Sequence, residues 1–213
     1  MERPLFQDRR DAGRRLGAAL ANHAGRGALV LGLPRGGVPV AFEVAQALAA
    51  PLDVFVVRKL GMPGHEEFAM GAIATGGVMV MNPDLREFHV PEAALEAVVA
   101  RERAELDRRE RLYRGDRPPL ALEGKTVIIV DDGLATGSTM LAAATAVKGA
   151  NPKAVVVAVP VAASETCQAL QSHVDDVVCA TTPEPFRAVG LWYRDFAQVD
   201  DAEVHALLEE APK

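Results

Sequence analysis

The chain has 213 residues, of which 49% are hydrophobic and 24% charged, and its formal net charge is −6. This length suits one well-buried domain with a small appended lobe, and the composition excludes a fibre or a disordered chain. A negative net charge gives no general attraction to nucleic-acid backbones, and no apolar stretch approaches the roughly 18 residues of a membrane span. We therefore expect a cytoplasmic protein that binds neither nucleic acid nor a membrane.

The chain has two cysteines, Cys167 and Cys179. They lack the spacing with histidine that zinc sites require, and a pair is too few for the disulfide framework of a small secreted domain. We expect two buried, small apolar side chains without a disulfide, and therefore a reducing compartment.

Short β-branched runs alternate with Ala- and Leu-rich segments of helical periodicity, which is typical of an α/β fold. We predict a doubly wound, mostly parallel central sheet. In chain order, the expected elements are a helix over 11–24, a strand over 28–33, a helix over 38–49, and strands over 53–58 and 77–81. Residues 58–77, rich in Gly and Pro, are expected to form a long loop.

The second half of the chain continues the alternation. It is expected to contain helices over 91–114, 138–149, 166–174 and 200–210, and strands over 124–132, 154–161 and 176–180. The helix over 91–114 begins at a proline, which suits a first helical turn. The strand over 124–132 is the strongest in the chain because its β-branched run is continuous, as in strands that are buried on both faces.

The strongest functional pattern, over residues 127–140, is a hydrophobic strand followed by two acids, a small-residue loop and a helix start. Asp131 and Asp132 stand at the carboxyl end of the strand, where open α/β sheets bind their ligands. Backbone N–H groups, hydroxyls and the helix dipole can surround a phosphate next to them. The residues that supply these groups are Ala135, Thr136, Gly137, Ser138 and Thr139.

The acids then lie one sugar away from the phosphate, where they can bind ribose hydroxyls or a hydrated Mg²⁺. The alternative is a plain strand-to-helix connection, capped by Ser138 or Thr139, with solvated acids. A Walker loop is excluded because no Lys follows the Gly, and the glycine spacing is not that of a dinucleotide fingerprint.

This run resembles the motif of type I phosphoribosyltransferases and is most similar to that of adenine phosphoribosyltransferases. The resemblance implies that residues 135–139 bind the 5-phosphate of 5-phosphoribosyl-1-pyrophosphate (PRPP). Asp131 and Asp132 would bind the ribose diol, act in catalysis and hold Mg²⁺ through water. The implied reaction is transfer of the phosphoribosyl group to a nucleobase with release of pyrophosphate. Ala135 replaces an Asp of hypoxanthine-guanine enzymes, which weakens that assignment, and purines are modestly favoured over pyrimidines.

A second strand, Gly turn and helix start spans residues 31–39. Gly36 and Gly37 can point backbone N–H groups at an anion, and Arg35 adds a charged fork. Alone, the pattern is also that of a plain turn. In the resembled family this loop binds pyrophosphate, and the corresponding peptide bond, between Pro34 and Arg35, is often cis.

The run 58–64 is similar to one in adenine phosphoribosyltransferases, although its Pro-Gly spacing differs by one residue. The resemblance places Arg58 and Lys59 beside the pyrophosphate, with Lys59 also in a catalytic role. The loop beyond would close and exclude water from an oxocarbenium-like ribose. Its proton-transfer candidates are His65, Glu66 and Glu67. We expect Glu67 to be catalytic, and a solvated charge is the alternative.

Aromatic residues gather in the tail, which is loosely similar to the base-binding hood of purine phosphoribosyltransferases. The resemblance implies that Phe186 and Trp192 contact the base, whereas aromatic residues near a terminus more often complete a core or a dimer contact. We expect a single domain over 1–213 with a core over about 11–180. The hood would comprise residues from about 181 to 213 and the N-terminal segment.

Two other functions compete with transfer to a base. The first is a regulatory protein of the same fold that senses PRPP without turnover. The second is a hydrolase with Asp131 as nucleophile, but the Lys-bearing motif that it needs is missing. The expected ligands are PRPP, a nucleobase, pyrophosphate and Mg²⁺, and a homodimer is compatible with the fold because two-fold pairing is common.

Overall fold

The computed structural model describes residues 4–25, 27–82 and 90–212, without the side chains of residues 66 and 67. Its core is a five-stranded sheet of order β2-β1-β6-β7-β8 in which every pair of neighbours is parallel. These strands are β1 (Ala28–Gly32), β2 (Leu52–Val54), β6 (Thr126–Val130), β7 (Ala154–Val161) and β8 (Asp176–Thr181). The doubly wound, mostly parallel fold predicted from the sequence is confirmed.

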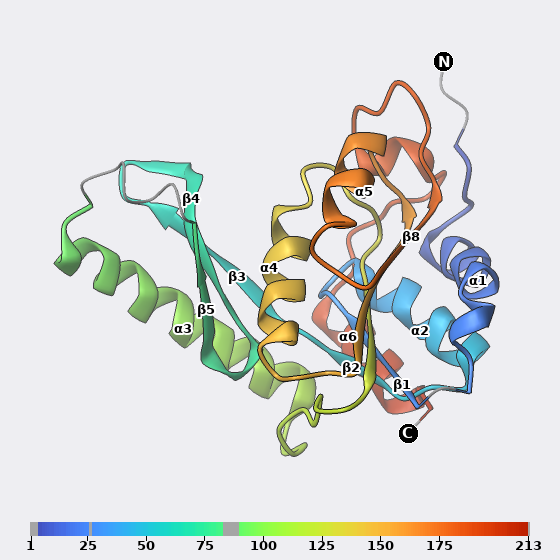
Figure 1. Ribbon diagram of the computed structural model, residues 1–213, viewed down its shortest axis with the longest axis horizontal. Coiled ribbons are helices and arrows are strands. Elements are labelled where there is room, and N and C mark those ends of the chain that lie inside the picture. The colour runs from blue at the N-terminus through green and yellow to red at the C-terminus, as the bar shows by residue number, and fades with distance from the viewer. Residues whose placement is uncertain (1–3, 26, 83–89, 213) are drawn as a thin grey trace.

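Helices cover both faces of this sheet (Figure 1). One face packs against α1 (Arg9–Ala19), α2 (Gly37–Leu48) and α6 (Asp201–Glu210), and the other against α4 (Ser138–Lys148) and α5 (Ser164–Leu170). In β6, Ile128 packs toward α2 and Ile129 toward α4. Because both faces of this strand are buried, its sequence is continuously apolar. None of the described helices is long and apolar enough to cross a lipid bilayer.

The winding of the sheet reverses at β1, which pairs with β2 on one side and with β6 on the other. Loops that leave two such strands diverge and open a crevice at their carboxyl ends. Gly32 is in register with Val130, so the segments that follow them leave the sheet side by side. Both predicted anion loops therefore start at the switch point of the sheet.

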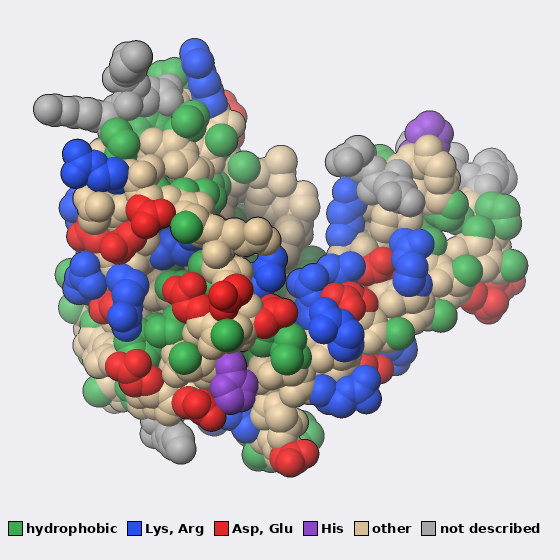
Figure 2. Space-filling model, turned by 180° about the vertical axis from the view of Figure 1, so that it is seen from behind, with side chains coloured by type: hydrophobic (Ala, Val, Ile, Leu, Met, Phe, Trp, Pro, Cys, Tyr) green, Lys and Arg blue, Asp and Glu red, His purple; other side chains and the backbone are tan. Residues whose placement is uncertain are grey.

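A second body, which we call the arm, projects from the core and consists of residues 57–82 and 90–114 (Figure 1). Its antiparallel sheet contains β3 (Val57–Met62), β4 (His65–Ala74) and β5 (Val78–Met81). The short helix η2 (Thr75–Gly77) connects β4 to β5. The long helix α3 (Glu92–Arg114) packs against this sheet. Figure 2 shows a hollow between arm and core, with Lys and Arg side chains gathered on the arm's side of it.

The arm corrects two predictions. The expected strand over 53–58 is split between β2 and β3, and the expected loop over 58–77 is mostly a hairpin. Met62 pairs with His65 across a turn of Pro63 and Gly64, with φ 79° at Gly64. Pro followed by a positive-φ Gly suits a type II turn. The register also shifts on both sides of Gly61, so the Gly and Pro content marks a turn and a bulge.

Polar contacts between described residues help to hold the arm. Within it, Arg58 of β3 donates to Glu102 of α3 through Nε at 2.9 Å and Nη2 at 2.6 Å. Toward the core, Arg114 Nε donates to Asp53 Oδ1 at 3.1 Å, and the Tyr113 hydroxyl donates to Asp201 Oδ1 at 2.6 Å. The last two contacts fix the end of α3 to β2 and α6.

The N-terminal segment lies against residues 192–194. The backbone N–H of Leu5 donates to the Trp192 carbonyl at 2.9 Å, and that of Arg194 donates to the Phe6 carbonyl at 2.9 Å. The short helix η4 (Val189–Trp192) is part of this contact. The apolar cluster beneath it consists of Phe6, Ala12, Val161, Trp192 and Tyr193, with Phe186 packed at its edge. The N-terminal residues thus pack with Trp192 and Tyr193, which are far from them in sequence.

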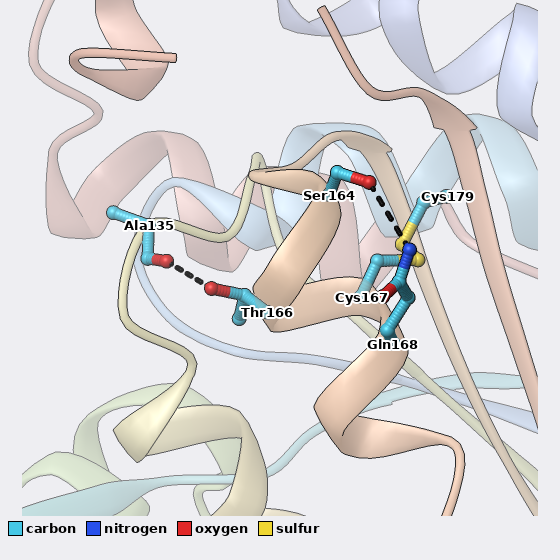
Figure 3. The surroundings of a disulfide bond; sticks show 6 residues. All are labelled: Ala135, Ser164, Thr166, Cys167, Gln168 and Cys179. Atoms are coloured by element: carbon cyan, nitrogen blue, oxygen red, sulfur yellow. Dashed lines mark hydrogen bonds between the residues drawn. A yellow bond between two sulfur atoms is a disulfide. The ribbon is translucent and has the colours of Figure 1, made fainter. Parts of the chain in front are cut away.

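Cys167 of α5 and Cys179 of β8 form a disulfide, with 6.5 Å between their Cα atoms (Figure 3). The expectation of two unbonded cysteines is therefore wrong, and the inference of a reducing compartment loses its basis. The spacing of 12 residues in sequence does not reveal the pairing. It arises because α5 lies against β8, so a helix residue and a strand residue face each other.

Candidate active site

The two predicted anion loops touch. A Cβ atom added to Gly36 would overlap Asp132 Oδ2, and one added to Gly37 would lie 2.7 Å from the Val130 carbonyl oxygen. Only glycine permits so close an approach of the two loops. The peptide bond between Pro34 and Arg35 is cis, which confirms what the family resemblance implied.

The surroundings of the acid pair disfavour its ionised form. Asp131 Oδ1 accepts from the backbone N–H of Asp132 at 2.8 Å, and Asp132 Oδ2 accepts from Arg9 Nε at 2.8 Å. Burial, and then the charge of Asp132, raise the pKa of Asp131 well above its ordinary value. Burial also raises the pKa of Asp132, although the hydrogen bond from Arg9 works against it. An additional cation would favour the ionised form of both groups.

The carboxylates of Asp131 and Asp132 are suitable ligands for Mg²⁺. Among the residues that the structure describes, no group of three or more His, Cys, Asp or Glu side chains could enclose a metal ion. Mg²⁺ commonly binds to one or two carboxylates and completes its shell with water and substrate phosphates. Asp131 and Asp132 therefore suit a hydrated Mg²⁺ ion, whose remaining positions water or the phosphates of a ligand would fill.

The loop from Gly133 to Gly137 connects β6 to α4, which begins at Ser138. Gly137 has φ 72°, a left-handed conformation that favours glycine. A pocket of about 290 Å³ lies between this loop and α5. It is lined by Thr136, Gly137, Ser138, Leu141, Glu165, Thr166, Ala169, Leu170 and His173. The loop hydroxyls and the N-terminus of α4 thus border a pocket on the α5 side of the loop, and neither Asp131 nor Asp132 lines it.

Helix α5 braces this loop from the other side of the pocket. The Thr166 hydroxyl donates to the Ala135 carbonyl at 2.5 Å (Figure 3). Thr166 immediately precedes Cys167, one of the two disulfide cysteines. A Cβ atom on Gly137 would lie 2.7 Å from the Thr166 methyl carbon. Adjacent residues of α5 therefore connect the loop to the disulfide: Thr166 contacts the loop and Cys167 forms the disulfide.

Other predicted site residues occupy the core and the arm. Arg35 lies near α6, with Nη1 3.8 Å from Asp201 Oδ1. Arg58 is bound by Glu102 inside the arm, and Lys59 is exposed on the neighbouring position of β3. The backbone of Glu67 belongs to β4, but its side chain lies outside the described part of the structure. The arm thus carries three of the predicted residues on a hairpin.

Trp192 and Phe186, predicted to contact the base, lie in the apolar cluster around Phe6. Trp192 is 5% exposed, and the ring of Phe186 stacks on it with centroids 6.4 Å apart. The burial of Trp192 favours the core role, which was the alternative to base contact. Phe186 is half-buried at the edge of the cluster.

The prediction missed two residues at the acid pair. Arg9, the first residue of α1, donates to Asp132, and the Tyr193 hydroxyl donates to the Asp132 carbonyl at 2.5 Å. Burial raises the pKa of Tyr193, so its hydroxyl remains protonated and able to donate. Arg9 is one of several arginines near the N-terminus, and no sequence pattern distinguishes it from the others.

Comparison with known proteins agrees with this geometry. Residues 9–191 match a family model described as a phosphoribosyl transferase domain. The chain is also 49% identical, over 208 residues, to proteins from two strains of Mycobacterium tuberculosis that are named provisionally as phosphoribosyl transferases. The match covers 97% of this chain and 47% of those proteins. The chain therefore spans about half the length of these curated relatives.

Solved structures share the fold. The crystal structure of TT1426 from Thermus thermophilus is 47% identical, with a TM-score of 0.85 over 97% of this chain and 98% of that one. A Neisseria gonorrhoeae protein crystallised with bound ppGpp is 15% identical, with a TM-score of 0.50 over 98% and 97% of the two chains, and it shows the fold alone. The family model matches most of the chain, and two adjoining loops meet at the switch point of its parallel sheet. The chain therefore belongs to the phosphoribosyl transferase family.

Proposed function

We propose that this domain transfers a 5-phosphoribosyl group from PRPP to a nucleobase and releases pyrophosphate in an Mg²⁺-dependent reaction. The observation that supports it most is the contact of the two loops: Gly36 and Gly37 abut Asp131 and Asp132 at the carboxyl edge of the sheet. A ligand with a phosphate at one end and a pyrophosphate at the other, separated by one sugar, matches this arrangement. PRPP has that chemistry.

In this proposal the core binds most of the donor. Residues 135–139 bind the 5-phosphate through backbone N–H groups, hydroxyls and the N-terminus of α4. Asp131 and Asp132 accept hydrogen bonds from the ribose diol and hold a hydrated Mg²⁺. Backbone N–H groups of Gly36 and Gly37, with the Arg35 guanidinium, bind the pyrophosphate and stabilise its charge as the glycosidic C–O bond breaks. For this, the Gly37 N–H must exchange the Leu33 carbonyl, to which it donates at 3.0 Å, for the ligand. Bound Mg²⁺ supplies further neutralisation of the departing pyrophosphate.

The arm and the terminal residues have complementary proposed roles. Lys59 and Arg58 reach the pyrophosphate from β3, for which Arg58 must exchange Glu102 for the ligand. Glu67, on β4, remains the candidate for proton transfer to or from the base. Residues from about 181 to 213 and the N-terminal segment form the hood, and the half-buried Phe186 suits contact with the base better than the buried Trp192 does. A purine is the preferred acceptor because the strand-loop motif is most similar to that of adenine enzymes.

The test combines binding and turnover. Pyrophosphate release is measured with PRPP, Mg²⁺ and a panel of purine and pyrimidine bases, and PRPP affinity is measured by calorimetry. Replacing Asp131 and Asp132 by Asn should lower kcat/KM by at least about a thousandfold, because it removes charge stabilisation at the reacting sugar. PRPP affinity that is unaffected by the double substitution would contradict the proposal.

The chain offers a matched control in a second acid pair, Asp175 and Asp176, which stands at the amino end of β8. Asp175 accepts from the Val155 backbone, and Asp176 pairs with His23. Replacing both by Asn should therefore affect stability but leave PRPP affinity unchanged. Tight PRPP binding without turnover on any base would instead favour the PRPP sensor.

A further inference from the structure

Arg9 places a fixed cation at the acid pair. Its Nε donates to Asp132 Oδ2 at 2.8 Å, and its Nη1 donates to the Ala197 carbonyl at 2.7 Å. The guanidinium carbon lies 3.9 Å from the centroid of the Phe196 ring. The side chains of Arg9 and Asp132 are only 12% and 16% exposed. Such a buried, charge-assisted contact is stronger than an ion pair on the surface.

The guanidinium stands where the two anion loops meet. A Cβ atom on Gly36 would lie 3.3 Å from Arg9 Nε and would also overlap Asp132 Oδ2. Arg9 therefore occupies the side of Asp132 that faces the first loop. Under the proposed function, this is the side on which a divalent ion would bridge the acid pair and the pyrophosphate.

Helix α1 and residues 193–197 together hold Arg9 in this position. Helix α1 packs closely on α2, since a Cβ atom on Gly13 would lie 2.7 Å from the Val40 carbonyl oxygen. From the C-terminal side, residues 193–197 contribute the Ala197 carbonyl and the Phe196 ring. Tyr193 in the same segment donates to the carbonyl of Asp132. The position of Arg9 is thus tied to that of residues 193–197.

We propose that Arg9 is a built-in counter-cation for Asp132, which a divalent ion must displace when it binds to the acid pair. The inference rests on the proposed function, because that function assigns a divalent ion to Asp131 and Asp132. Two cations at one carboxylate repel each other, so the Arg9 guanidinium competes with the metal. When Arg9 leaves Asp132, its contacts with Phe196 and Ala197 change as well. Metal binding is thereby coupled to residues 193–197.

The first test uses Mn²⁺ alone and the protein without PRPP. Free Mn²⁺ is measured by electron paramagnetic resonance during titration of wild type and of Arg9→Gln. The variant should bind Mn²⁺ at least about tenfold more tightly, which corresponds to about 1.4 kcal/mol. Arg9→Lys keeps the positive charge and should bind Mn²⁺ as weakly as wild type. Arg9→Met replaces Arg9→Gln if the latter does not fold.

The matched control is the next residue of α1. Arg10 is also an arginine, but its Nε lies 2.8 Å from Glu43 Oε1, away from the acid pair. Arg10→Gln should leave the affinity for Mn²⁺ unchanged. An increase in this variant would mean that general loss of positive charge, rather than displacement of Arg9, raises the affinity.

The second test measures whether metal binding changes the surroundings of residues 193–197. Trp192 is the only tryptophan of the chain and immediately precedes Tyr193, so its fluorescence reports on this segment. Mg²⁺ should change the emission of wild type. In Arg9→Gln, Mg²⁺ should bind without that change, because Arg9 is no longer there to be displaced.

Three outcomes overturn the inference: equal Mn²⁺ affinity of wild type and Arg9→Gln, tight binding by Arg9→Lys, and absence of Mn²⁺ binding by both wild type and Arg9→Gln. Failure of the proposed function is distinguishable from these. It appears as absence of pyrophosphate release from PRPP with every base, and tighter Mn²⁺ binding by Arg9→Gln would still support the counter-cation role.

Discussion

The core and the arm present functional residues in different ways. In the core, two complete loops leave β1 and β6 side by side, because Gly32 and Val130 are in register in one sheet. The arm carries single side chains on a hairpin, and one of them, Arg58, is bound by Glu102 of its own helix. The core site is therefore preformed by strand pairing. In the arm, by contrast, the position of a side chain such as Arg58 depends on contacts within the arm. Substitutions in the core and in the arm can test whether the core site is preformed and the arm residues are not.

Gly37→Ala should have the largest effect, because it breaks the contact of the two core loops. The added methyl group would lie 2.7 Å from the Val130 carbonyl oxygen and 2.9 Å from Asp131 Cα, and backbone atoms cannot move aside cheaply. A displacement of about 1 Å should lower PRPP affinity about a hundredfold. Overpacking should also cost about 1 to 3 kcal/mol of stability.

Calorimetry with PRPP and urea unfolding check this prediction. Gly149→Ala, at the end of α4 where φ is −61°, is the control and should leave PRPP affinity unchanged. Normal PRPP affinity in Gly37→Ala would show that the loops need not touch.

Removing the disulfide tests whether the brace on the phosphate loop belongs to the core. Replacing Cys167 and Cys179 by Ser should lower stability by about 3 kcal/mol, the amount expected from constraining a loop of this length in the unfolded chain. Hydrogen exchange should increase in α5 and in the loop at Ala135, which Thr166 holds, and remain unchanged in the arm. A melting temperature that a reducing agent does not lower in wild type would refute this prediction.

Gly13→Ala should loosen α1 from the core. Its methyl group would lie 2.7 Å from the Val40 carbonyl oxygen and 2.8 Å from Glu43 Cβ, at the crossing of α1 and α2. We expect a loss of about 1 to 3 kcal/mol, measured by urea unfolding. Because Arg9 begins the same helix, affinity for Mn²⁺ should rise as well. Ala18→Ser, on the exposed side of α1, should change neither quantity.

Glu102→Gln should have the smallest effect and act on the arm. Burial raises the pKa of Glu102, but hydrogen bonds and charge from Arg58 and Arg101 outweigh it, so the pKa lies below its ordinary value. A carboxyl group with a lowered pKa contributes stability that is complete above the unfolded pKa and is lost as pH falls through the folded pKa. Stability from this contact should therefore decrease in acid.

The substitution should cost about 1 kcal/mol at pH 7, since the pair is partly exposed. It should also flatten the dependence of stability on pH below the ordinary value of 4.5. Urea unfolding at pH 7 and pH 4 gives both quantities, with the exposed Glu96→Gln as control. An unchanged pH dependence in Glu102→Gln would mean that other carboxyl groups account for it, such as Glu105, whose hydrogen bond from Arg108 lowers its pKa to about 2.

The elements that could be predicted are those whose burial is visible as a periodic pattern of apolar residues in the sequence. Strand β7 has the predicted bounds and α3 nearly so, because a buried strand and a long helix have their own periodicities. The hairpin of β3 and β4 was read as a loop because its turn and bulge residues are also loop residues. The disulfide was missed because its partners meet only when α5 lies against β8.

The parallel α/β core, the acid pair at the end of β6 and the small-residue loop that follows it can all be predicted from the amino-acid sequence. Each of these depends on residues within about ten positions of one another, so the pattern is visible in the chain. In contrast, the contact of Arg9 with Asp132, 123 residues away, and that of Arg58 with Glu102 become visible only in the folded protein. Such contacts are selected by how helices pack on the sheet, and no local spacing encodes that packing.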